Sequence, residues 1–436
     1  MAGMLFSRCL AVLGTFCLTA LATPPNIVLI ISDDHGWADH GFMGHAVVRT
    51  PNIDKLASES LTFTRGYVPT SLCRTSLASI MTGLYPHQHR IVGNDPPGDA
   101  RSAENRTRMA ALFQRSKTIA WMLGAKGYVS HQSGKWWEGE CTCCFTECMT
   151  HGDVARGGRH GDEGLKIGRE TMKPVFDFID HAGNRPFFLW YAPMMPHTPH
   201  NPPERLLARY RSPDRPIALA RYYAMIEWFD ETVGQLLSHL QQRGLSENTV
   251  VLYLADNGWV QLAEQRTLDE TRAKMSPYDA GLRTPILVRW PGRIRPRRDS
   301  TTPVNSVDLA PTILAAAGAA RPRDLPGIDL RDSARLGRRN AAYGATFVHT
   351  SVDLEKLEAN LKYRWVVRGH WKLIEPYRPN RKLVLWDRFP STGWSEETEL
   401  YDIVEDPEEK ANLADKNASL VVTLRKALDL WWRVPE

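Results

Sequence analysis

One cysteine lies just ahead of a run of apolar residues with helical spacing. The apolar positions that follow Cys73 are Leu77, Ile80, Met81 and Leu84, which predict one buried face of a helix. A cysteine at a helix N-terminus meets free backbone N–H groups and the positive end of the helix dipole, and both favour a thiolate or a bound anion. The alternative interpretation of Cys73 is a small buried core residue.

Oxygen-bearing side chains follow two apolar runs that are typical of buried parallel strands. Asp33 and Asp34 follow residues 27–31, and Asp256 and Asn257 follow residues 250–255. Open α/β sheets bind ligands at the carboxyl ends of their strands, and oxygen ligands suit a hard cation such as Ca²⁺ or Mg²⁺. Taken alone, an Asp-Asp pair is also typical of a loop or a helix cap.

Three basic side chains lie in comparable places. Lys135 follows a predicted strand that begins at Tyr128, and Lys274 lies in a loop ahead of another apolar run. His197 follows the strand predicted over residues 186–191, and the prolines around it restrict its movement, which a catalytic group needs. Alone, each lysine is as compatible with a solvated surface residue, and the histidine with a structural one.

Taken in order, these segments resemble the sulfatase family. Residues 73–83 resemble the signature Cys-x-Pro-Ser-Arg with a later Thr-Gly, and residues 134–136 resemble the start of Gly-Lys-Trp-His. Residues 196–199 resemble Pro-His-x-Pro, and residues 274–285 resemble Lys-x-x-x-Tyr-Glu-Gly-Gly-x-Arg-x-Pro. The resemblance runs from about Asn26 to Leu413, so the chain is identified as a member of this family.

The resemblance implies a fold and a division of the chain. The expected fold is α/β, with a large mixed sheet between helices and a smaller C-terminal α+β domain. We expect a signal peptide over residues 1–22, the catalytic domain over 24–338, and an antiparallel sheet with a closing helix over 339–436.

The resemblance also implies a mechanism. A maturation enzyme would oxidise Cys73 to formylglycine, whose hydrated form attacks the sulfur of a sulfate ester. Calcium, with magnesium as the alternative, would contact this group and four side chains: Asp33, Asp34, Asp256 and Asn257. Lys135 and Lys274 would balance the charge of the sulfate, and His197 would protonate the departing alcohol. The expected substrate is a sulfated small molecule or glycan.

Three positions depart from the family pattern. Thr75 replaces the proline of the signature, and Leu77 replaces an arginine that anchors the formylglycine and is recognised during maturation. Trp137 replaces a histidine that contacts the formylglycine, and we expect its ring to line the substrate site. Two alternatives stay open: a phosphoester hydrolase that uses the Cys73 thiolate, and a silent sulfatase fold that binds sulfated glycans.

Composition, the N-terminal sequence and the cysteines indicate where the protein works and which partners it lacks. The 436 residues carry 54 basic and 49 acidic side chains. The resulting net charge of +5 is too small to indicate nucleic-acid binding. An apolar run that ends in Ala20-Leu21-Ala22 predicts an exported protein, periplasmic or extracellular, without stable membrane insertion. In such a protein we expect two disulfides, with zinc or free thiols as alternatives, among four crowded cysteines: Cys141, Cys143, Cys144 and Cys148.

Overall fold

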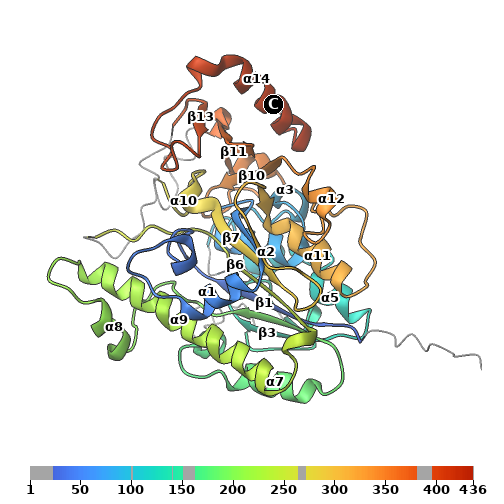
Figure 1. The fold of residues 1–436 in the computed structure, drawn as a ribbon. Helices are drawn as coiled ribbons and strands as arrows, with labels where there is room; N and C mark the ends of the chain where they lie inside the picture. The colour runs from blue at the N-terminus through green and yellow to red at the C-terminus, as the bar shows by residue number, and fades with distance from the viewer. Residues whose placement is uncertain are drawn as a thin grey trace, which may run out of the picture.

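The computed structural model describes residues 23–99, 102–139, 141–150, 163–263, 272–380 and 395–435. These residues form a nine-stranded mixed sheet and a four-stranded antiparallel sheet, with helices packed on both (Figure 1). This is the fold class that the sequence predicted. The division at residue 338 stays a prediction, although the two sheets lie on either side of it in the chain.

The large sheet has the strand order β4-β3-β5-β1-β6-β7-β2-β8, and β9 pairs with β2. Strands β3, β5, β1 and β6 are parallel, whereas β7 runs antiparallel to both β6 and β2. The strands are β1 (Asn26–Ser32), β2 (Leu61–Tyr67), β3 (Val129–Gly134), β4 (Glu147–Cys148), β5 (Phe187–Ala192), β6 (Thr249–Ala255), β7 (Arg283–Arg289), β8 (Arg297–Asp299) and β9 (Val304–Asn305).

Two helical layers cover this sheet because alternate residues of each strand point to opposite faces. Ile27 and Leu29 of β1 pack into a core with helices α2 (Cys73–Thr82), α4 (Ala103–Phe113), α5 (Ile119–Gly124) and α11 (Leu309–Ala316). Val28 and Ile30 pack into a second core with α1 (Pro51–Ser58), α7 (Lys173–Ala182) and α9 (Ile217–Gln242). Figure 1 shows α7 and α9 on one side of the sheet and α5 and α11 on the other.

The small sheet has the order β10-β11-β12-β13 and carries α14 (Ala418–Trp431) on one face. Its strands are β10 (Ala341–Phe347), β11 (Leu361–Arg368), β12 (Trp371–Pro376) and β13 (Glu399–Asp402). The shorter helices are α3 (Pro86–His89), α6 (Glu163–Lys166), α8 (Glu204–Tyr210), α10 (Asp279–Leu282) and α12 (Ser333–Leu336). The smaller C-terminal antiparallel sheet of the predicted fold class is therefore present, and α14 packs on it.

Helix α2 differs from its prediction. It begins at Cys73, as the spacing predicted, but all ten of its residues are buried rather than one face of them. The predicted buried face is confirmed, and the rest of the helix is buried as well because α2 packs between the sheet, α5 and α11.

One disulfide joins Cys141 to Cys148, which confirms oxidation of two of the four crowded cysteines. It also removes both sulfurs from the zinc alternative, since a metal ligand must be a thiolate. The side chain of Cys143 lies outside the described residues, so the second disulfide stays a prediction. The predicted signal peptide also lies outside them, and no helix in the described part of the chain is long and apolar enough to cross a membrane.

Candidate active site

Strand direction explains why residues far apart in sequence meet at one edge of the large sheet. The parallel strands β3, β5, β1 and β6 all end there, and they are followed by Lys135, the His197 loop, Asp33 and Asp256. Strand β2 is antiparallel to β7, which is antiparallel to β6, so β2 also ends at this edge and leads to Cys73. Strand β7 begins there, and Lys274 precedes it. The structure thus brings every predicted catalytic residue to one place.

The acidic loop after β1 is fixed by its neighbours. The N–H of Asp33 donates to the carbonyl of Met195 at 2.9 Å, and the N–H of Asp34 donates to Asp256 Oδ1 at 3.2 Å. Asp34 has a φ of 56°, in the left-handed region that aspartate tolerates better than most residues. Asn257 Nδ2 donates to Asp34 Oδ1 at 2.7 Å. These bonds link the ends of β1, β5 and β6.

Both lysines are buried against these carboxylates. Lys135 Nζ lies 2.5 Å from Asp33 Oδ1 and 3.5 Å from Asp256 Oδ2, and Lys274 Nζ lies 2.6 Å from Asp34 Oδ1. Gly134 has a φ of 85°, and a Cβ on it would lie 1.9 Å from the carbonyl oxygen of Ala192, so only glycine fits ahead of Lys135. The surface interpretation of Lys135 is therefore wrong.

Cys73 lies beside the acidic group at the first position of α2. Its Sγ is 4.0 Å from Asp34 Oδ1. Burial raises the pKa of the Cys73 thiol to about 12, although Lys135 and Lys274 both act to lower it. In the metal-free site, burial thus disfavours the Cys73 thiolate more than the two lysines favour it.

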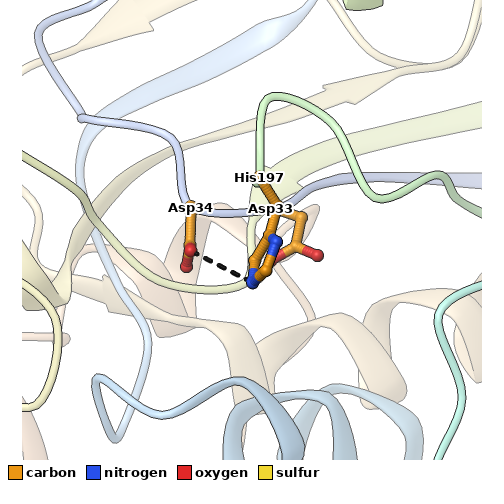
Figure 2. Close-up of side chains that lie close together, drawn as sticks. All are labelled: Asp33, Asp34 and His197. Atoms are coloured by element: carbon orange, nitrogen blue, oxygen red, sulfur yellow. Dashed lines mark ion pairs between the residues drawn. The ribbon is translucent and has the colours of Figure 1, made fainter. Parts of the chain in front are cut away.

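His197 faces the acidic loop from the segment after β5. Figure 2 shows its ring against the carboxylate of Asp34, with Nε2 3.4 Å from Oδ2. His197 Nδ1 lies 2.7 Å from the carbonyl oxygen of Thr198, which can only accept, so Nδ1 carries a proton and Nε2 faces the site. Burial lowers the pKa of His197 more than Asp33 and Asp34 raise it.

The charges of the site are unbalanced on their own. Three buried carboxylates face two lysines. Burial and the neighbouring Asp33 raise the pKa of Asp256 to about 8. Burial would raise the pKa of Asp34 too, but Lys274, His197 and Lys135 outweigh it and hold that pKa well below its usual range.

Several oxygens of this group have lone pairs that the described residues do not use. No described group donates a hydrogen bond to three buried atoms: Asp33 Oδ2, Asp34 Oδ2 and Asn257 Oδ1. Two sets of side chains offer ligand atoms within 4.8 Å of one another: Asp33, Asp34 and His197, and Asp33, Cys73 and Asp256. Buried oxygens that accept no hydrogen bond, together with excess negative charge, fit a divalent hard cation.

Comparison with known proteins assigns the chain. A sequence model of the sulfatase family matches residues 25–319, and that of the C-terminal region of N-sulphoglucosamine sulphohydrolase matches residues 272–431. The chain belongs to the sulfatase family. It is a sulfuric ester hydrolase.

Relatives and solved structures agree with this assignment. Arylsulfatase A of Homo sapiens is 31% identical over 71% of this chain and 68% of its own length. N-acetylgalactosamine-6-sulfatase of Canis lupus familiaris is 30% identical over 74% of this chain and 69% of its own. A structure in complex with its substrate D-glucosamine-2-N,6-O-disulfate has a TM-score of 0.71 at 19% identity, covers 93% of this chain and 97% of its own, and shares the fold.

The departures of this sulfatase from the family pattern are accommodated by packing. Leu77 is buried in the core on the α2 side of the sheet. Trp137 is buried too, and its ring centroid lies 5.0 Å from Lys135 Nζ, so it contacts the lysine without offering an exposed face. Arg74 does not replace the missing arginine, because its Nε and Nη2 pair with both oxygens of Glu138 at 2.8 and 2.7 Å.

Sequence reasoning missed the residue that holds the His197 loop. Arg169 donates to the carbonyls of Met194 (2.5 Å) and His197 (3.0 Å), and also to Pro199 O and Asn201 Oδ1. Nothing in its local sequence indicates this role, since Arg169 lies between two helices and has no motif around it.

Proposed function

We propose that this sulfatase hydrolyses a sulfate ester of a carbohydrate, with a formylglycine made from Cys73 and a calcium ion held by Asp33, Asp34, Asp256 and Asn257. The observation that carries this proposal is the convergence on Cys73 of three carboxylates and two lysines, all buried. Magnesium is the alternative ion. The names of the relatives favour a sulfated amino sugar.

Charge supports both the ion and the substrate. Apart from His197 and the formylglycine, three ionised carboxylates and two lysines leave one net negative charge, so a divalent cation makes this set singly positive. A sulfate monoester carries one negative charge, and its binding makes this set of charges neutral. Because buried charges are costly unless they are compensated, this balance favours the complete complex over any part of it.

Each residue then has a defined task. Lys135 and Lys274 are positioned to bind the sulfate oxygens and to stabilise the negative charge that develops on them. His197 presents Nε2 to the site, while the Thr198 carbonyl holds Nδ1–H, so a proton on Nε2 can pass to the departing sugar oxygen. When bound, calcium polarises oxygen and favours its ionised form, and the formylglycine supplies the attacking oxygen.

The thiolate alternative requires Cys73 to stay unmodified. A phosphoesterase that attacks with sulfur needs a thiolate at working pH. Burial disfavours that form in the metal-free site, whereas a bound cation would favour it. The mass of the tryptic peptide that contains Cys73 tests this point directly. A fully unmodified thiol in active protein would contradict the formylglycine proposal.

Activity and metal content test the rest. Purified protein should release sulfate from at least one member of a panel of sulfated mono- and oligosaccharides, and Cys73→Ala should abolish that release. Turnover by Cys73→Ala within about tenfold of wild type, a barrier change near 1.4 kcal/mol, would exclude Cys73 from the mechanism. Release from no ester by formylglycine-bearing protein would favour the silent, glycan-binding alternative.

The metal assignment has its own matched pair of variants. Asp256→Ala should lose both metal and activity, because it removes a ligand oxygen. Asp39→Asn changes a carboxylate outside the ligand set and should keep the metal. Equal metal content in the two variants, measured by mass spectrometry of the digested protein, would reject the ligand set.

We also propose that the chain is exported, as the run before Ala22 predicts, and that a maturation enzyme converts Cys73. Co-expression of a formylglycine-generating enzyme should then raise the fraction of modified peptide.

A further inference from the structure

A cavity of about 950 Å³ opens beside the His197 loop. Its wall includes Thr198 and His200 on one side and the first turns of α9, with Ile217 and Arg221, on the other. Thr198 is also the residue whose carbonyl holds Nδ1 of His197 at 2.7 Å. The cavity therefore begins one residue away from the group that protonates the leaving alcohol.

Among the described residues, the cavity wall carries one positive charge without a partner. Arg211 and Glu204 both line it and pair with each other, so their charges cancel. Arg221 is exposed and forms no ion pair with the described residues. The first N–H groups of a helix lack partners within it, and the N-terminus of the 26-residue α9 adds the positive end of its dipole.

His200 supplies a polar group in the same wall. Burial lowers the pKa of His200 to about 4, which favours the neutral ring. Its Nε2 is buried and has no hydrogen-bond partner among the described residues.

We propose that this cavity binds the sugar next to the sulfated one, and that Arg221 binds a sulfate or carboxylate on that sugar. The inference rests on the proposed function, because the sugar is the leaving group that His197 protonates. The body of the substrate must lie on the His197 side of the sulfate, which is where the cavity lies. A neutral imidazole suits a sugar hydroxyl, and an unpaired guanidinium suits an anion.

Arg221→Gln and Arg108→Gln form the matched pair for a test. Both arginines are exposed and lie on helices, and neither forms an ion pair with the described residues, but Arg108 lies on α4, which lines no part of the cavity. Calorimetric titration of Cys73→Ala protein avoids turnover. The probes are three disaccharides of 6-sulfated N-acetylglucosamine, linked to galactose, to glucuronic acid or to galactose 6-sulfate.

Arg221→Gln should weaken binding of a probe with a charged neighbour about tenfold and change binding of the galactose probe less than twofold. Arg108→Gln should change none. Loss with glucuronic acid alone identifies a carboxylate site, and loss with galactose 6-sulfate alone identifies a sulfate site. An equal loss for all probes, no loss, or no binding of any probe would overturn the inference. Sulfate release from 4-nitrophenyl sulfate by wild type reports on the proposed function separately, since that ester has no neighbouring sugar.

Discussion

Replacing Arg169 should impair catalysis by releasing the loop that carries His197. The guanidinium of Arg169 donates to four acceptors between Met194 and Asn201, two of them the carbonyls of Met194 and His197 in a partly buried setting. No described bond from Arg169 reaches a carboxylate or lysine of the site. Arg169→Ala therefore removes support for the loop without removing a direct bond to the acidic group or the lysines.

The size of the effect follows from those two partly buried bonds. A hydrogen bond from a charged donor contributes about 1.5–3 kcal/mol, so the pair stabilises the loop by roughly 3–6 kcal/mol at most. The two bonds in exposed positions, to Pro199 and Asn201, add little because water replaces them. We expect about a hundredfold loss of kcat, near 2.7 kcal/mol, since misplacing a catalytic group by about 1 Å costs on this order.

The assay compares two leaving groups. A sugar hydroxyl is a poor leaving group and needs the proton that we propose His197 supplies, whereas the phenol released from 4-nitrophenyl sulfate is a far weaker base and needs it less. Arg169→Ala should therefore slow hydrolysis of the sugar sulfate much more than that of the aryl sulfate. Arg185→Ala is the control, because Arg185 also bonds to backbone carbonyls, at the end of α7. Equal losses on both substrates would refute the reasoning.

Three further outcomes are expected. Lys372→Met should lower the free energy of unfolding by about 3–5 kcal/mol in urea titrations, because it leaves the buried carboxylate of Glu409 without its cation and that of Asp279 with Arg283, 3.8 Å away, as its ion-pair partner. Burial raises the pKa of Asp39 from 3.8 to about 7, so the folded protein holds this proton more tightly than the unfolded chain does. The stability of the wild type therefore falls as pH rises from about 4 to 7. Asp39→Asn should gain stability relative to wild type over this range in thermal scans. Leu77→Arg should keep or raise the formylglycine fraction in peptide mass spectra, and a lower fraction would contradict the packing explanation for Leu77.

Much of the site could be predicted because strand ends are visible in the sequence. The apolar runs before Asp33 and Asp256 are those of buried strands, and parallel strands end at one edge, so their polar successors must meet. The lysines and His197 were assigned by resemblance, and the geometry brings them to the same edge. The order of the strands and of the polar residues that follow them thus predicted most of the site.

The remaining features depend on tertiary packing. Trp137 lies against the ammonium of Lys135, and Arg74 pairs with Glu138. Both contacts depend on how α2 and the loop after β3 pack against one another. The spacing of apolar residues in α2 could not indicate burial on all sides, because its polar residues Thr75 and Ser76 are enclosed by other elements. The spacing of apolar residues predicts which side of a helix is buried first, but not whether other elements also cover its polar side.

Hydrogen bonds join the two segments that carry Cys73 and Lys274, and the small sheet in turn contacts the second of these segments. The N–H of Met275, next to Lys274, donates to the carbonyl of Ser71 at 3.0 Å, and Ser71 Oγ donates to Ser276 O at 2.7 Å, so the segments that carry Lys274 and Cys73 are joined.

The small sheet holds the same segment from its other end. Lys372 on β12 pairs at 2.8 Å with Asp279, whose N–H donates to Glu409 at 2.6 Å. All three residues are buried, so separating the two sheets would expose apolar surface and leave charges without partners. Because Asp279 lies five residues after Lys274, we expect a change in the small sheet to alter the position of the lysine that binds Asp34. The Lys372→Met variant should for this reason raise KM for the sulfate ester as well as lower stability, and an unchanged KM in folded protein would show that the small sheet stabilises the fold without positioning Lys274.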